Sequence, residues 1–505
     1  MMRYPLIEEV RTSWSAPELF HVMKERPCSF FLDSGMDPQK LGRYSFMGSD
    51  PFLVVSSRGS EVTLTRGSER ETRRGNPFDI LCGLLEEHAL DRGPAVVPFV
   101  GGAVGYLGYD LCHFVERVPS RAVDDLQLPE SCFAFYDSVI GFDHREGRAY
   151  LVATGLPEMD EGRRLERARL RLAELRERHF GRSTRAVADG SPEHGLPTME
   201  PSCRACDDVS AALYDDEEGR GIRLRSSFTR EEYVRAVDRV REYIAAGDVF
   251  QVNLSQRFCA DMSVSAYDLY GRLRVVNPAP FASYLDFPEV TVVSASPERF
   301  IKRQGDIVET RPIKGTRPRG RNAAEDERLA KELVNSAKDR AENVMIVDLE
   351  RNDLGRICRY GSVQVTELAI LETFPTVHHL TSTVVGRLNR GSKNAELLKA
   401  MFPGGSITGA PKVRAMEIID ELEKTRRGIF AGSIGYLGFN GDLDINIAIR
   451  TFFTREGKAY FQVGGGIIYD SDSEAEYIET LDKARGLVRA LASDADVIPA
   501  QEQEH

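Results

Sequence analysis

Segments with the composition of β-strands occur in clusters along this chain, and segments with helical periodicity lie between those clusters. The strand-like segments span residues 28–65, 132–142, 149–153, 249–259, 290–294, 300–311, 430–440, 443–454 and 459–468. Helices with an apolar face are expected at residues 157–180, 229–244, 325–352, 410–424 and 474–491. Because the strands cluster instead of alternating with single helices, the pattern predicts an α+β fold rather than a regular βαβ winding.

The chain has 505 residues, and single hydrophobic cores stop growing at about 250–300 residues. Large apolar residues become rare between residues 181 and 226, where Gly, Pro, Ser and Asp accumulate. We therefore expect an N-terminal lobe at residues 1–180, a linker or excursion at 181–226, a second domain at 227–495 and a C-terminal tail at 496–505.

The net charge of −12 argues against nucleic-acid and anionic-membrane partners, which require a basic surface. No segment approaches the roughly 18–20 apolar residues of a membrane-spanning helix, and no basic and apolar leader opens the chain. We expect a cytoplasmic protein. Cys203 and Cys206 form the only close cysteine pair, and without a second pair or a histidine at ligand spacing they predict reduced thiols rather than a zinc site.

Residues 312–316 (PIKGT) predict a lysine in a tight loop directly after the strand-like segment 307–311. Proline fixes φ and glycine relaxes it, so the backbone around Lys314 is constrained rather than flexible. A lysine held in this way becomes a nucleophile when burial or its neighbours favour the neutral amine. The alternative is an ordinary surface lysine in a turn.

Two pairs of acidic residues recur at helical spacing, Asp339 with Glu342 and Glu476 with Glu479. Residues three apart share a helix face, so each pair presents two carboxylates together. Two such faces across a cleft would suit Mg²⁺, which prefers oxygen ligands. Alternatively the acids face solvent, with Glu476 in a capping box and Glu479 in an ordinary i,i+4 ion pair with Lys483.

Residues 403–412 have the glycine spacing of a phosphate-binding loop, but Ala410 and Pro411 stand where that loop needs Lys and Ser or Thr. A nucleotide site is therefore not expected. What remains is a set of backbone N–H groups at the start of a predicted helix at Ala410, which can hold a carboxylate. Arg450 can clamp a second carboxylate, or it can pair with any nearby acid.

Several longer motifs occur in the order of one enzyme family. They are residues 247–258 (GDVFQVNLSQRF), 295–299 (ASPER), 312–316 (PIKGT), 377–380 (VHHL), 403–412 (PGGSITGAPK) and 464–466 (GGG). Together they resemble the chorismate-utilising enzymes over residues 225–492, and residues 42–46 (GRYSF) resemble the N-terminal lobe of the same family. The resemblance implies β-sheets packed in a sandwich-like core, with helices around it and the active site in a cleft.

Within this family, Gln251 stands where isochorismate and salicylate synthases carry a lysine base, and Lys314 stands where anthranilate synthases usually carry alanine. The chain resembles most closely the branch that makes 4-amino-4-deoxychorismate for folate synthesis. That branch implies addition of the Lys314 amine at C2 of chorismate as the C4 hydroxyl leaves, followed by entry of ammonia at C4. The alternatives are an anthranilate synthase and, outside the enzymes, a non-catalytic chorismate- or tryptophan-binding protein.

The resemblance also implies roles for single residues. Glu298 resembles the general acid that protonates the leaving hydroxyl, and His379 resembles an active-site histidine near C4. Glu342 and Glu479 resemble the Mg²⁺ ligands, with Asp339 and Glu476 one helical turn away. Contacts with chorismate are implied for Gln251, Ser406, Thr408, Arg450, Gly464, Gly465, Gly466 and Lys483.

No cysteine of the chain lies in the nucleophile elbow of a glutamine amidotransferase, so the resemblance implies a separate glutaminase subunit that supplies ammonia. Residues 31–35 (FLDSG) depart from the Leu-Leu-Glu-Ser segment through which anthranilate synthases bind tryptophan. Inhibition by tryptophan is therefore not expected, and a structurally bound tryptophan stays open.

Overall fold

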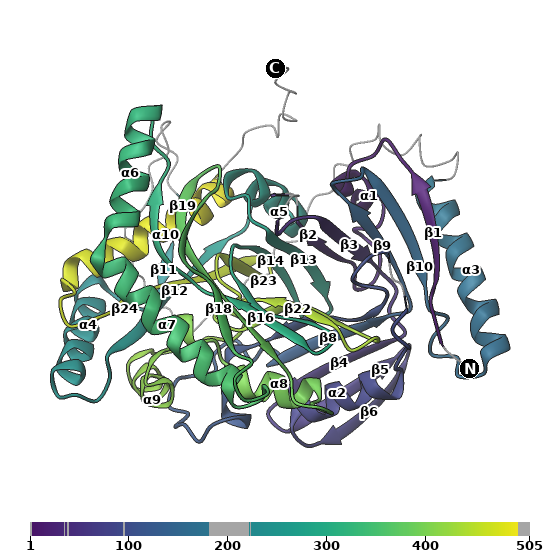
Figure 1. Cartoon of the computed structure of the whole chain (residues 1–505), viewed down its shortest axis with the longest axis horizontal. Helices are drawn as coiled ribbons and strands as arrows, with labels where there is room; N and C mark the ends of the chain where they lie inside the picture. The colour runs from purple at the N-terminus through teal and green to yellow at the C-terminus, as the bar shows by residue number, and fades with distance from the viewer. Residues whose placement is uncertain are drawn as a thin grey trace.

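The computed structural model describes residues 3–34, 36–37, 40–93, 96–180, 222 and 224–492. Outside the described residues lie Gly35, the predicted tail and most of the predicted linker, including Cys203 and Cys206, while the last residues of that linker form a short strand, β11 (Arg225–Ser226). Within the described part, the chain forms two large antiparallel sheets with helices on their outer faces (Figure 1). This architecture confirms the predicted α+β class.

The first sheet combines strands from both halves of the chain. Its order is β1 (Leu6–Arg11), β10 (Arg148–Ala153), β9 (Ser138–Asp143), β3 (Tyr44–Gly48), β2 (Phe30–Asp33), β13 (Phe281–Phe287), β14 (Val290–Ser296), β23 (Thr451–Arg455), β24 (Lys458–Ile467), β12 (Gln251–Asp261) and β11 (Arg225–Ser226), with β20 (Gly409–Ala410) paired to β12.

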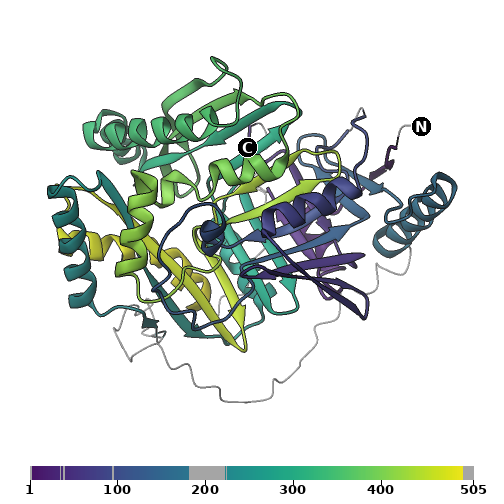
Figure 2. The same cartoon turned by 90° about the horizontal axis from the view of Figure 1, so that it is seen from below.

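The second sheet is built in the same way. Its order is β17 (Ile313–Pro318), β19 (Val377–Arg387), β16 (Ile307–Arg311), β15 (Arg299–Gln304), β22 (Leu443–Asn446), β21 (Ser433–Gly438), β7 (Gly102–Leu107), β8 (Ser131–Tyr136), β4 (Leu53–Arg58), β5 (Glu61–Arg66) and β6 (Glu69–Arg74), with β18 (Gln364–Thr373) paired to β19. The segments 1–180 and 227–495, predicted as separate units, thus share both sheets, and their strands lie side by side in Figure 2.

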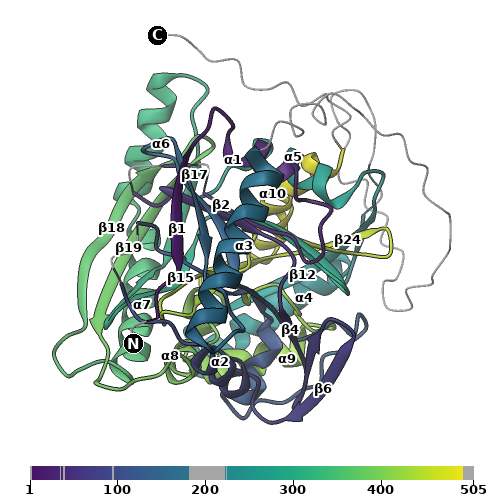
Figure 3. The same ribbon diagram turned by 90° about the vertical axis from the view of Figure 1, so that its right-hand side faces the viewer.

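Helices cover the outer faces of the sheets. They are α1 (Ala16–His21), α2 (Pro77–Glu87), α3 (Glu161–Phe180), α4 (Arg230–Ala245), α5 (Ala266–Val276), α6 (Ala323–Asn335), α7 (Ala337–Gly355), α8 (Asn394–Met401), α9 (Lys412–Leu422) and α10 (Ser473–Ala492). Helix α3 packs on β1 and β10, and Figure 3 shows it beside β1. No helix of the described part is both long and apolar enough to span a bilayer.

Neighbouring aromatic residues on one strand enter different hydrophobic clusters. Phe30 of β2 and Phe453 of β23 belong to the cluster between the two sheets, while Phe31 and Phe452 belong to the cluster beneath α1, α5 and α10. Because successive side chains of a strand point to opposite faces, both faces of this sheet are buried. Burial on both faces explains why these strands appear in the sequence as continuous apolar runs.

Three local expectations differ from the structure. The segment 312–316, predicted as a tight loop, lies largely in β17, and the pairing register with β19 shifts between Ile313 and Thr316. A glycine with φ of 88° at position 315 accommodates this irregularity. The single helix predicted at 325–352 is divided into α6 and α7 at Ser336, whose hydroxyl accepts a hydrogen bond from the Asp339 amide.

The helix predicted to begin at Ala410 begins at Lys412 instead. Gly409 and Ala410 pair with Val252 and Gln251 as a short strand, and Pro411 is the residue before the helix. Proline is compatible with a helix start but the residue before it is forced into extended backbone, which moves the helix two residues along the chain.

We predict that Phe31→Ala lowers the free energy of unfolding by about 3–5 kcal/mol, because it removes a buried aromatic side chain. Phe31 is 0% exposed and its ring stacks on Phe20 at 5.0 Å. The matched control is Phe250→Ala, since Phe250 is 70% exposed and its loss should change stability by less than about 0.5 kcal/mol. Urea unfolding measures both variants, and equal losses would contradict the layered packing.

Candidate active site

Lys314 lies on β17, and its side chain is partly buried. Within the described part of the chain, its ammonium group makes no hydrogen bond and no ion pair. Burial is the largest cause that lowers the pKa of Lys314, and the charge of Lys483 acts in the same direction, while Glu342, Glu298 and Glu479 oppose it. The neutral form of the amine is therefore more populated than in a free lysine, and a nucleophilic lysine must be neutral.

Gly466 of β24 lies beside this amine. A Cβ atom at position 466 would stand 3.5 Å from Lys314 Nζ and 2.3 Å from Gln251 Nε2. A side chain at this position would displace the buried Gln251 amide, so glycine is required where β24 passes the lysine. The structure thus brings together Lys314, Gln251 and Gly466, three of the residues predicted for the site.

The Gln251 side chain is 0% exposed, and neither its amide nitrogen nor its amide oxygen has a partner among the described residues. An unpaired buried amide costs roughly 1–3 kcal/mol, because it has lost its hydrogen bonds to water. Such an amide next to a reactive amine is suited to hold polar groups of a substrate.

Glu298 follows β14 and is 5% exposed. Burial raises the pKa of its carboxyl to about 7, against the opposing effects of a Ser406 hydrogen bond, the Lys314 charge and the Ile313 amide. A carboxyl with this pKa still carries its proton in a large fraction of molecules near neutral pH. It is thus suited to general acid catalysis.

His379 of β19 is paired with Thr316 of β17, and the Thr316 hydroxyl lies 2.8 Å from its Nδ1. Its Nε2 is buried without a partner in the described part of the protein. Burial, with the neighbouring charge of Arg450, lowers the pKa of His379 to about 3. The imidazole is therefore neutral near pH 7, which makes it a hydrogen-bonding group rather than a cationic acid.

Arg450 has a positive φ of 50°, and its Nη1 donates a 3.0 Å hydrogen bond to Asn277 Oδ1. Burial lowers its pKa, and no acid of the described residues forms an ion pair with it. The alternative in which Arg450 pairs with a nearby acid is therefore not observed. A partly buried guanidinium without a carboxylate partner is a candidate site for a substrate carboxylate.

The two predicted pairs of acids lie on α7 and α10. Three of them are engaged: Asp339 with Arg317 at 3.1 Å, Glu476 with the Ser471 hydroxyl at 2.6 Å, and Glu479 with Lys483 at 2.7 Å. The last contact is the i,i+4 ion pair that the sequence offered as an alternative. Glu342 makes no ion pair or hydrogen bond within the described residues.

The acids of the two helices face one another. Burial raises the pKa of Glu342, and the negative charge of Glu479 raises it further. The same charge raises the pKa of Glu476, after burial and against a hydrogen bond from Ser471. A Cβ atom at Gly465 would lie 3.0 Å from Glu476 Oε2, so that glycine lets the acidic face of α10 approach β24.

These carboxylates fit Mg²⁺ in their chemistry, because two oxygen ligands completed by water and substrate oxygens are a usual Mg²⁺ environment. No group of three or more Asp, Glu, His or Cys residues is gathered in a metal-binding arrangement in the described ranges. The predicted Mg²⁺ site therefore stays a prediction based on Glu342 and Glu479.

The remaining predicted residues have local roles. Ser406 lies close enough to Glu298 to lower the pKa of that carboxyl, and Thr408 Oγ1 donates within its own turn to Gly404 O at 2.9 Å. Lys483 Nζ donates to Gly464 O at 2.9 Å, which ties α10 to β24. The backbone N–H groups expected at a helix start at Ala410 are not available there, since Ala410 belongs to β20.

Two charged residues near these groups were not predicted. Lys338 of α7 influences the pKa values of Glu342, Glu476 and Glu479, and its spacing of four residues from Glu342 could have indicated this. Glu350, further along α7, is 2% exposed, and no motif in the sequence marked it.

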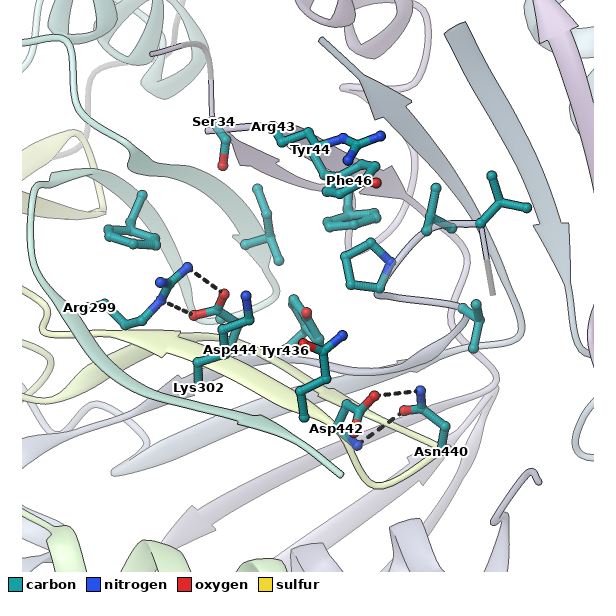
Figure 4. A pocket seen from close by; sticks show the side chains of 18 of the residues that line it. Ser34, Arg43, Tyr44, Phe46, Arg299, Lys302, Tyr436, Asn440, Asp442 and Asp444 are labelled. Atoms are coloured by element: carbon teal, nitrogen blue, oxygen red, sulfur yellow. Dashed lines mark hydrogen bonds and ion pairs between the residues drawn. The ribbon is translucent and has the colours of Figure 1, made fainter. Parts of the chain in front are cut away.

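A cavity of about 850 Å³ lies away from these residues, between the sheets near β2, β3 and β22 (Figure 4). Leu32, Asp33 and Ser34, from the segment compared with tryptophan-binding enzymes, line it. The Asp33 carboxylate accepts hydrogen bonds from the Tyr270 hydroxyl at 2.8 Å and from Arg274. It is therefore already engaged, and the expectation about tryptophan stays untested.

Comparison with known proteins identifies the family. A family model described as chorismate binding enzyme matches residues 30–489. The chain belongs to the chorismate-binding enzymes. Aminodeoxychorismate synthase component 1 of Bacillus subtilis (strain 168) is 40% identical over 450 residues, 89% of each chain. Anthranilate synthase component 1 of Acetivibrio thermocellus is 38% identical over 496 residues, 98% of this chain and 96% of its own.

The fold is shared with solved enzymes. The crystal structure of anthranilate synthase component I from Streptococcus pneumoniae TIGR4 has a TM-score of 0.72 and 30% identity, covering 95% of this chain and 99% of that one. The predicted chorismate-enzyme fold is thereby confirmed. Relatives named as two different synthases are similarly identical in sequence to this chain. Sequence identity to these relatives therefore does not determine which product this chorismate-binding enzyme makes.

We predict that Gly466→Ala lowers chorismate turnover by about 100-fold, because displaced catalytic groups typically cost this much. The substitution places a Cβ 2.3 Å from Gln251 Nε2. Gly486→Ala is the matched control, since nothing lies within 4 Å of a Cβ at that position. Steady-state kinetics measures both, and equal activity of the two variants would contradict the close approach of β24.

We also predict that Glu298→Gln changes how stability depends on pH. The Glu298 pKa of about 7 lies above the ordinary glutamate value of 4.5, so the folded state binds more protons than the unfolded chain between these pH values. The stabilisation relative to the unfolded chain is present below about pH 4.5 and is lost as pH rises through 7, by roughly 3 kcal/mol. Urea unfolding measures the free energy of unfolding at pH 5 and at pH 8. The fall in this free energy from pH 5 to pH 8 should be smaller for Glu298→Gln than for the unsubstituted protein. An identical loss would mean that Glu298 titrates normally.

Proposed function

We propose that the protein aminates chorismate at C4 to give 4-amino-4-deoxychorismate, with Lys314 as a covalent nucleophile. The observation that carries the proposal is the Lys314 amine, which lacks an ion-pair partner in the described part and lies beside Gln251 and Gly466. An anthranilate synthase would not need this amine, and an isochorismate synthase would need a base at the position of Gln251.

In the proposed reaction, the Lys314 amine adds to C2 of chorismate while the ring double bonds shift and the C4–O bond breaks. Glu298 donates its proton to the departing hydroxyl, which leaves as water. Ammonia then attacks C4, the bonds shift back, and the C2–N bond breaks to return Lys314. Chorismate and ammonia thus give 4-amino-4-deoxychorismate and water.

Other residues support the same assignment through binding. The Arg450 guanidinium is available for one carboxylate of chorismate, and the unpaired Gln251 amide for its polar groups. Neutral His379 is available as a hydrogen-bonding group. Glu342 and Glu479 would hold Mg²⁺, which when bound supplies positive charge for the second carboxylate.

We further propose that a separate glutaminase subunit supplies the ammonia. The relatives from Bacillus subtilis and Klebsiella aerogenes are both called component 1 of an aminodeoxychorismate synthase, which supports the existence of a second component. Free ammonia should replace that component in a test of the reaction.

The direct test is a product assay with chorismate, ammonium ions and Mg²⁺. The proposal predicts a product that a lyase converts to p-aminobenzoate. Formation of fluorescent anthranilate instead would establish the alternative, which is supported by relatives named anthranilate synthase at similar identity.

Lys314→Ala is predicted to abolish formation of 4-amino-4-deoxychorismate and to shift any remaining ammonia-dependent product toward amination at C2, because C2 is no longer occupied by the lysine. Chromatography of both products measures the ratio. Lys331→Ala is the control, since Lys331 is an exposed lysine in an ion pair with Glu327. An unchanged rate and product in Lys314→Ala would remove the nucleophile assignment.

Glu342→Gln is predicted to lose Mg²⁺ binding and Mg²⁺-dependent turnover while the fold is kept, because an amide keeps the shape but not the ligand charge. Calorimetric titration with Mg²⁺ measures the binding, and Glu327→Gln on α6 is the control. Unchanged Mg²⁺ affinity in Glu342→Gln would exclude Glu342 as a ligand.

A further inference from the structure

A short turn connects the candidate acid Glu298 with a second buried glutamate, Glu350. The turn is a 3-10 helix over Gly405–Ile407, directly before Thr408. On one side the buried Ser406 hydroxyl lies close enough to Glu298 to lower the pKa of that carboxyl, and on the other side the Gly405 N–H donates a 3.1 Å hydrogen bond to Glu350 Oε1. Both glutamates are nearly inaccessible, at 5% and 2% exposure.

The turn packs directly on α7. A Cβ atom at Gly405 would lie 2.5 Å from Leu349 Cδ2 and 3.2 Å from Glu350 Oε1, so a side chain at this position would have to displace Leu349. The charged groups that act on Glu350 are Asp353, Lys412 and Glu298.

Lys412 is not available to Glu350 as an ion-pair partner. Its ammonium group pairs with Asp353 and donates a second hydrogen bond to Met401 O at 3.0 Å. The second carboxyl oxygen of Glu350, Oε2, is buried without a partner in the described part of the chain. Among the described residues, the hydrogen bond from Gly405 is thus the one that the Glu350 side chain makes.

We propose that Glu350 is a positioning residue for Glu298: its carboxyl anchors the Gly405–Ile407 turn so that the Ser406 hydroxyl stays on the acid. The proposal rests on the proposed role of Glu298 as the general acid. Glu350 itself would touch neither chorismate nor the reacting atoms.

The proposal has a consequence that can be measured without substrate. Burial raises the pKa of Glu298, and the Ser406 hydrogen bond acts against that increase, together with Lys314 and the Ile313 amide. If the turn is released, the Ser406 contribution is lost while the other two groups stay in place. The pKa of Glu298 should then rise, and the acid should be less well positioned.

The experiment compares Glu350→Leu with Glu350→Gln in the full chain. Both remove the ionisable carboxyl of Glu350, but only glutamine keeps an oxygen that accepts the Gly405 hydrogen bond. The protonated carboxyl band of Glu298, identified by its absence in Glu298→Gln, is titrated by infrared spectroscopy. We expect a higher titration midpoint in Glu350→Leu than in Glu350→Gln, and equal midpoints would overturn the proposal.

A second comparison keeps an ionisable carboxyl at position 350 and makes the test independent of whether the leucine variant folds. Glu350→Asp stays ionisable but is too short to keep the bond to Gly405, so its Glu298 midpoint should lie above that of the unsubstituted protein. A midpoint that does not rise would count against the proposal. Asp348→Asn, on the exposed side of α7 in an ion pair with Arg351, is the control.

The route through Ser406 is tested with a double-variant cycle. Ser406→Ala should raise the midpoint by itself, and combining it with Glu350→Leu should add nothing further, because coupled residues act non-additively. Fully additive shifts would show that Glu350 does not act through Ser406.

In the amination assay, kcat of Glu350→Leu should fall roughly 10- to 100-fold with KM for chorismate little changed, and Glu350→Gln should recover most of the loss. A change in KM alone would contradict a positioning role. If the unsubstituted protein does not aminate chorismate, the proposed function fails, while the substrate-free titrations still decide whether Glu350 positions Glu298.

Discussion

Burial is the first cause of the pKa shifts of Lys314, Glu298 and Arg450, three ionisable groups that different parts of the chain deliver to one region. Burial disfavours the charged form of each group, so the amine becomes more nucleophilic and the carboxyl retains its proton. The same loss of surrounding water favours binding of an anion to the Arg450 guanidinium. A single physical effect therefore prepares a nucleophile, an acid and a carboxylate site.

Such groups are expensive to keep in a folded protein. Unpaired buried charges cost several kcal/mol each, against a total stability of about 5–15 kcal/mol. Hydrophobic burial offsets this unfavourable free energy, because aromatic and aliphatic residues fill the space between the two sheets and beneath the helices on both sides. Backbone pairing fixes the functional residues further, since β12 pairs with β24 near Gln251 and β17 pairs with β19 near Lys314.

Much of this arrangement was accessible from the sequence, but in pieces. The i,i+3 spacing of the acids correctly placed Glu342 and Glu479 on helices, and the constrained backbone around Lys314 was recognised, although as a loop and not as a bulged strand. Spacing could not show that the two acidic faces meet, nor that β2 pairs with β13 about 250 residues later, because such contacts depend on tertiary packing. Glu350 was missed because a single acid on a helix has no pattern, and its role depends on a turn 55 positions away.

The central claim is that Lys314 forms a covalent bond with chorismate. Mass spectrometry of the intact protein after incubation with chorismate and Mg²⁺, without ammonia, tests it most directly. The account predicts a mass increase equal to chorismate minus water, located by peptide mapping at Lys314 and absent from Lys314→Ala. Conversion of chorismate to 4-amino-4-deoxychorismate at full rate, with no adduct at Lys314 detectable under any trapping condition, would contradict it.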